Sequence, residues 1–167
     1  MSIRFNWCRY GRCKSAFSLI ELLFVLCIIG ILLSLSVPSL NHFVARNHFS
    51  LMQTRLLNAL YMTKVMAMDH HQVVVLCGSR DGAHCDGDWN ANWLVVEAKT
   101  HQVRHVFNGE HYNVDVRFAG NFQGREGVSF NAQGGSGKQG RFSLTLHSYH
   151  AAIILIETGR MRVDSES

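Results

Sequence analysis

The chain has 167 residues, of which 47% are hydrophobic, which is ordinary for one modest globular domain with an attached segment. The net charge of +4 comes entirely from residues 1–16, which hold four basic residues and no acidic one (Arg4, Arg9, Arg12 and Lys14). From Phe17 onward, 12 basic residues balance 12 acidic ones. If residues 1–16 are removed, this balance excludes a partner attracted by overall charge, and any anion binding must depend on a local patch.

Residues 17–37 form an apolar run that is long enough to cross a bilayer as a helix. At about 1.5 Å per residue the run would span roughly 31 Å, which matches a bilayer core of about 30 Å. The basic flank predicts a cytoplasmic N-terminus and a C-terminal part across the membrane. Ala16 precedes the apolar run, whereas an ordinary signal-peptidase site would follow it.

Glu21 is the only charged residue between Ala16 and Pro38. An ionised carboxylate in hydrocarbon usually has a partner and a role. The alternative is a glutamate that merely reaches the headgroups from near the cytoplasmic end of the span.

Residues 39–69 contain no glycine or proline and predict an amphipathic helix that continues from the apolar run. The apolar stripe expected to pack on the rest of the protein comprises Met52, Leu56, Ala59, Leu60 and Met66.

From residue 72 onward, short β-prone runs alternate with turn residues. The predicted strands are 73–77, 93–97, 103–107, 112–118, 127–130, 141–146 and 151–157. The chain therefore predicts an α+β fold, with a long helix over 17–71 and an antiparallel β domain over 72–167.

Cys77 and Cys85 enclose a short polar loop and would lie in the exported part. In an oxidising compartment a disulfide is the simplest interpretation. Zinc binding together with His84 is the alternative, although no second cysteine pair supports it.

The stretch AFSLIE at residues 16–21 resembles the processing site of bacterial type IV prepilins and type II secretion pseudopilins. The resemblance implies that prepilin peptidase cuts after Ala16, removes the leader 1–16 and methylates the new amine of Phe17. It also implies that Glu21, at the fifth mature position, offsets that amine's charge on a neighbouring subunit during assembly. Pro38 matches the family's proline at position 22, whereas Ala16 departs from the usual glycine.

The segment VLCGSRDGAHCDGDWNANWLVV (75–96) and the stretches 135–146 and 153–163 resemble the FimT/GspH subfamily of minor pilins. This resemblance implies two small β-sheets packed against the long helix. It also implies other pilin or pseudopilin subunits as partners.

Arg160 and Arg162 follow Gly159 and would project from one face of an extended segment, about 6.5–7 Å apart. Two guanidinium groups in this arrangement can bind phosphates. The alternative is a solvated terminal strand whose arginines protect a sheet edge. Gly-Arg-x-Arg near the C-terminus resembles the motif of FimT-type pilins linked to DNA uptake, which favours DNA contact. Lys138 and Arg141 are further candidates for the same contact.

Ten histidines are present, but no HExxH, GxSxG or phosphate-binding loop accompanies them. We therefore expect no enzymatic activity, no metal and no cofactor. Two functions stay open: a FimT-like minor pilin that binds DNA without sequence preference during natural transformation, and a GspH-type minor pseudopilin that is a structural part of type II secretion.

Overall fold

The computed structural model describes residues 19–109, 112–120 and 127–166, without the side chains of residues 33–39 and 165–166. The predicted leader 1–16 and Phe17 lie outside these residues. The chain divides into two compact units, Met1–Asn41 and His42–Ser167. The helix α1, Leu19–Asp69, contributes to both units, and we describe each unit by itself.

In the first unit, the described residues are all helical, and the large apolar side chains of residues 19–32 are exposed. Glu21 is exposed in the first turn of α1. Across the described residues, no helix combines the length and the apolar character that a membrane crossing requires.

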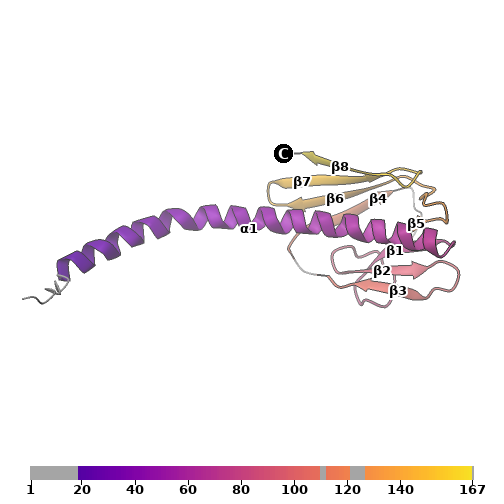
Figure 1. Ribbon diagram of the computed structural model, residues 1–167, viewed down its shortest axis with the longest axis horizontal. Coiled ribbons are helices and arrows are strands. Elements are labelled where there is room, and N and C mark those ends of the chain that lie inside the picture. Colours follow the sequence, from indigo (N-terminus) through magenta and orange to yellow (C-terminus); the bar gives the residue numbers. More distant parts are fainter. Residues whose placement is uncertain (1–18, 110–111, 121–126, 167) are drawn as a thin grey trace, which may run out of the picture. The chain divides into compact units, whose positions relative to one another are not determined.

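The second unit contains the C-terminal half of α1 and two antiparallel sheets of four strands each (Figure 1). One sheet has the order β3-β2-β1-β5 and is built from Val103–Phe107, Asn92–Glu97, Val74–Ser79 and Val128–Phe130. The other has the order β4-β6-β7-β8 and is built from Asp115–Gly120, Gly140–Leu146, Tyr149–Leu155 and Met161–Glu166. The chain changes sheets three times, after β3, after β4 and after β5, because β5 pairs with β1 although it lies between β4 and β6 in the sequence.

One face of α1 supplies side chains to a core shared with both sheets. Met52, Leu56, Ala59 and Leu60 are buried as predicted, while Met66 is only half-buried. The buried helical residues recur every three or four positions, which is the period of one helix face. The α+β fold predicted from the sequence is therefore confirmed.

The strand boundaries differ from the predicted ones where the backbone leaves the extended region. Strand β4 begins at Asp115 rather than at residue 112, and Asn113 has a left-handed φ of 56°. Strand β7 ends at Leu155, because Ile156 begins a tight turn that leads into β8. The terminal stretch that the sequence placed after Gly159 forms this eighth strand.

Removing a fully buried helical side chain should destabilise the globular unit. Leu56→Ala is expected to lower the free energy of unfolding by about 2–5 kcal/mol, because it leaves a cavity between helix and sheets. Denaturant unfolding followed by the fluorescence of the buried Trp89 and Trp93 would measure the change. Leu51→Ala, at a position that is 52% exposed, is the control and should change stability much less.

Candidate nucleic-acid interface

Arg141 and Arg162 lie in one row across the second sheet. Arg141 of β6 is paired with Ile154 of β7, and Ile154 is paired with Arg162 of β8. Directly paired residues share a face of an antiparallel sheet, and strands are about 4.8 Å apart, so the two arginine backbones stand about 10 Å apart. Both arginines are exposed and Ile154 is half-buried between them. We call these three residues the arginine row.

The face is the outer one because its neighbours along β6 point the opposite way. Phe142, Leu144 and Leu146 alternate with Arg141, Ser143 and Thr145 and are buried in the core. Since side chains alternate along a strand, burying the first set requires the second set to face solvent.

Arg160 lies immediately before β8 in the turn at residues 156–160, which we call the basic turn. The Ile156 amide donates to the Arg160 carbonyl at 3.1 Å, and the Gly159 amide donates to the Ile156 carbonyl at 2.8 Å. Gly159 has a φ of 74°, and a Cβ at this position would lie 1.9 Å from the Gly134 carbonyl oxygen. Only glycine meets both requirements, so the turn that presents Arg160 depends on Gly159.

The 131–138 loop and α1 hold the basic turn in place. The amides of Ser136 and Gly137 donate to the Glu157 carbonyl at 3.0 and 3.2 Å, and the Ser136 hydroxyl hydrogen-bonds the Ile156 carbonyl at 3.0 Å. From α1, the ammonium of Lys64 donates to the Gly159 carbonyl at 3.0 Å. Turn, loop and helix therefore form one connected structure.

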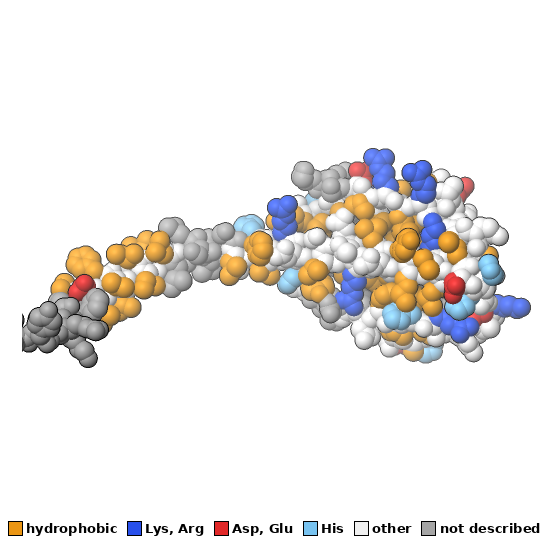
Figure 2. Space-filling view, viewed as in Figure 1, with side chains coloured by type: hydrophobic (Ala, Val, Ile, Leu, Met, Phe, Trp, Pro, Cys, Tyr) orange, Lys and Arg blue, Asp and Glu red, His pale blue; other side chains and the backbone are white. Residues whose placement is uncertain are grey.

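The structure thus brings the predicted basic residues to one end of the second sheet. Arg160 and Arg162 are two residues apart, Arg141 shares the row of Arg162, and the loop that carries Lys138 is bonded to the basic turn. Among the described residues, no acidic side chain pairs with Arg141, Arg160 or Arg162. Figure 2 shows that the basic side chains on the face in view are scattered, in keeping with the balanced charge after the leader.

The sequence analysis missed two residues of this region. Lys64 is 95 residues from Gly159, and its sequence context indicates only a solvated lysine on a helix. The fold brings it beside the basic turn. Asp164 follows Arg162 by two positions on the same face of β8, and an alternating strand pattern could have indicated it.

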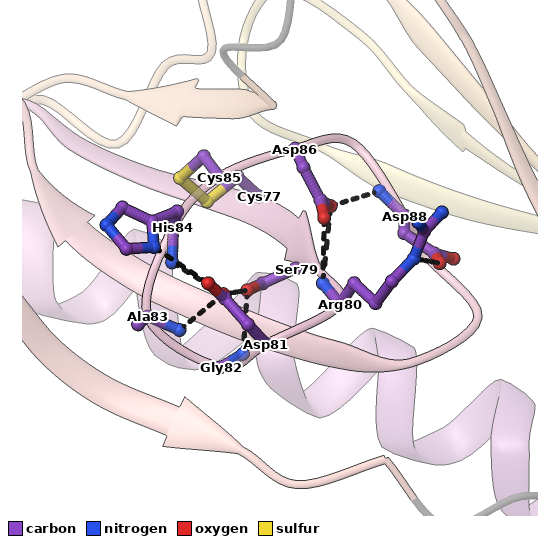
Figure 3. The surroundings of a disulfide bond; sticks show 10 residues. All are labelled: Cys77, Ser79, Arg80, Asp81, Gly82, Ala83, His84, Cys85, Asp86 and Asp88. Atoms are coloured by element: carbon purple, nitrogen blue, oxygen red, sulfur yellow. Dashed lines mark hydrogen bonds and ion pairs between the residues drawn. A yellow bond between two sulfur atoms is a disulfide. The ribbon is translucent and has the colours of Figure 1, made fainter.

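The loop between Cys77 and Cys85 is closed by a disulfide with a Cα–Cα distance of 5.6 Å (Figure 3). The Asp81 carboxylate accepts hydrogen bonds from the amides of Ala83 and His84, at 2.8 and 2.9 Å, and lies 2.7 Å from His84 Nδ1. These bonds, the one to the His84 ring first, hold the pKa of Asp81 well below its ordinary value, and Asp81 in turn raises the pKa of His84. The Nδ1 atom of the His84 ring therefore already has a hydrogen-bond partner, the Asp81 carboxylate of its own loop.

Across the described residues, no cluster of three or more His, Cys, Asp or Glu side chains is placed to hold a metal ion. Glu97 is the only charged side chain in that part of the chain that is buried, and Arg104 binds it through Nη2 at 2.6 Å and Nε at 3.2 Å. This bond to Arg104 is the main reason why the pKa of Glu97 lies below its ordinary value. Such a pair is a structural feature of the β2–β3 edge.

Known proteins resemble this chain in fold and in sequence. The C-terminal half of α1 packs on two small antiparallel sheets. A crystal structure of the type IV minor pilin FimU from Pseudomonas aeruginosa PAO1 shares this fold, with a TM-score of 0.57 and 13% identity over 73% of this chain and 92% of that one. A second crystal form of FimU matches with a TM-score of 0.47 and 11% identity over 72% and 90% of the two chains.

The family model described as type II transport protein GspH matches residues 53–160. The chain belongs to this family. No curated protein sequence matches it.

The Asp81–His84 contact predicts the titration of His84. Its pKa should lie above the ordinary value of about 6.5 and return toward it in Asp81→Asn. A raised folded-state pKa contributes stability below the unfolded-state value, and this contribution is lost as pH rises through the folded-state value. The lowered pKa of Asp81 acts in the opposite sense: its contribution is present above the unfolded-state value and is lost as pH falls through the folded-state one.

Chemical shifts of the His84 ring, followed by NMR across pH, would measure this pKa. Asp86→Asn is the matched control, because Asp86 accepts amides of the same loop and has no bond to His84. An unchanged His84 pKa in Asp81→Asn would contradict the assigned contact.

Proposed function

We propose that the chain is a FimT-like minor pilin that assembles into a type IV pilus and binds DNA without sequence preference during natural transformation. The observation that carries the proposal is the grouping of Arg141, Arg160 and Arg162, which we call the arginine site. Guanidinium groups that face solvent without acidic partners can bind phosphate oxygens with charge-assisted hydrogen bonds. Phosphate contacts hold DNA without reading its sequence.

The site suits this role because its parts are held in place. Arg141 and Arg162 stand on β6 and β8, which both pair with β7, and Arg160 stands on a turn bonded to the 131–138 loop and to α1. The backbone that carries these arginines is therefore in place before a phosphate binds, so only their side chains have to be ordered on binding. Lys138 lies on the same loop and is exposed, so we include it as a peripheral contact.

The N-terminal segment has its own proposed role. Residues 17–37 would anchor the protein in the inner membrane in a single pass, with the N-terminus in the cytoplasm and the globular unit in the periplasm. Prepilin peptidase would cut between Ala16 and Phe17 and methylate Phe17. The exposed position of Glu21 in α1 leaves its carboxylate available to the new amine of a neighbouring pilin subunit.

A GspH-type minor pseudopilin of a type II secretion system is the second candidate, favoured by the description of the matching family. In that role the protein would be a structural subunit without nucleic-acid binding. Both candidates are non-catalytic and need no cofactor.

DNA binding by the full-length protein in a non-ionic detergent tests the first candidate. Arg160→Gln with Arg162→Gln should weaken binding to a labelled duplex at least about tenfold, equal to about 1.4 kcal/mol. The slope of log affinity against log salt should fall by roughly two, because each lost phosphate contact releases about 0.9 counterion less. Fluorescence anisotropy at several salt concentrations measures both quantities.

The matched control is Arg80→Gln with Lys99→Gln, which removes the same charge from loops of the other sheet. A folded Arg160/Arg162 variant with wild-type affinity would refute the site. A wild-type protein that binds no DNA at low salt would favour the secretion candidate.

Processing and assembly are tested separately in the producing cell. Mass spectrometry of the membrane-extracted protein should find N-methylated Phe17 at the N-terminus. Glu21→Ala should be processed but should enter sheared filaments poorly, whereas Glu21→Asp, which keeps the charge, should enter them better. Retention of residues 1–16 in filaments, or normal incorporation of Glu21→Ala, would contradict these roles.

A further inference from the structure

A polar groove lies beside the arginine row on the outer face of the second sheet. Its lining side chains come from three adjacent strands and are Arg141, Ser143, Thr145, His150, Ala152 and Asp164. Ser143, Ala152 and Asp164 form the row next to the arginine row. The small side chains of Ser143 and Ala152 leave the centre of the groove open, while longer side chains border it.

The polar side chains of this groove have no partners within the part of the chain that the structure describes. No hydrogen bond or ion pair there engages the hydroxyls of Ser143 and Thr145, the ring of His150 or the carboxylate of Asp164. On the neighbouring strand β4, by contrast, the charged side chain of Arg117 does have a partner, because its Nε lies 2.8 Å from the Asp115 carboxylate. Hydroxyls, a histidine ring and a carboxylate that line one groove without such partners can bind a small polar group.

The charges along β8 determine which group fits. Arg160 and Arg162 mark the basic end, and Asp164 follows on the same face about 6.5–7 Å further along. A second phosphate at Asp164 would be repelled, so a DNA backbone cannot continue along β8 over this residue without an electrostatic cost. A carboxylate instead accepts hydrogen bonds from the amino groups of bases.

In a duplex these edges are largely occupied by pairing, whereas an unpaired base presents its whole Watson–Crick edge. We propose that the groove is a subsite for one unpaired base of single-stranded DNA, with the adjacent phosphates on the arginine site and Asp164 accepting from the base amino group. The inference rests on the proposed DNA binding and names the form of DNA that the site prefers.

The proposal predicts a preference between two pyrimidines of similar size. Cytosine offers its N4 amino group at the edge, whereas the one edge donor of thymine lies between two carbonyl oxygens that repel a carboxylate. Oligo(dC) should therefore bind the full-length protein about three- to tenfold more tightly than oligo(dT), the effect expected of one hydrogen bond. Both single strands should bind more tightly than a duplex of equal length.

Asp164→Ala provides the decisive comparison. It should abolish the preference for oligo(dC) and at the same time strengthen duplex binding, because it removes both the acceptor and the repulsion. Asp69→Ala is the control: Asp69 is 78% exposed at the end of α1, so the variant changes net charge equally but should preserve the preference. Fluorescence anisotropy at pH 7.5 and fixed salt measures all three oligonucleotides.

The outcomes separate this inference from the function on which it rests. Equal affinity for oligo(dC) and oligo(dT), in a protein whose DNA binding is still weakened at least about tenfold by Arg160→Gln with Arg162→Gln, would overturn the subsite alone. A preference for oligo(dC) that survives Asp164→Ala would also overturn it. Absence of any DNA binding by the wild-type protein would overturn the proposed function together with the subsite.

Discussion

Both sheets pack on the same face of α1, and the globular unit depends on the burial of that face. Leu56, Ala59 and Leu60 have no exposed surface and belong to the same core as residues from each sheet. Each sheet has one apolar face, and it needs a second layer to cover that face. Thr63 is also fully buried on α1, and its hydroxyl donates to the Ala59 carbonyl at 2.7 Å within the helix.

The position of the arginine site follows from this packing. Core burial of Phe142 and Leu144 turns Arg141 and Ser143 outward, and the pairing of β6, β7 and β8 then places Arg141 in the row of Arg162. Arg160 depends on the same core more directly, because Lys64 extends from α1 to the Gly159 carbonyl. Buried apolar residues thus determine where the arginines lie on the surface.

Local sequence patterns predicted most of the elements. The strand runs at 93–97 and 103–107 and the buried helix stripe around Leu56 and Leu60 follow from periodicity, because such periods record which face is buried. The sheet membership of β5 could not be predicted, since pairing with β1 is a property of the whole fold. The same holds for Lys64 at Gly159 and for the groove at Ser143 and Asp164, which exist only after distant strands align. The grouping of Arg141 with Arg162 was a hypothesis that needed the register of two hairpins.

The contact between Lys64 and Gly159 also has a consequence for the order of folding. It joins residues 95 positions apart. Similarly, β2, β3 and β4 lie between β1 and its partner strand β5 in the sequence. Contacts between distant residues slow folding, because a long chain must be ordered before they form. The contacts of α1 with these late elements therefore form last. The basic turn is completed only when β8 pairs with β7. In the proposed topology the N-terminus stays in the cytoplasm and β8 is the last element to be exported, so the arginine site would be completed after the rest of the globular unit.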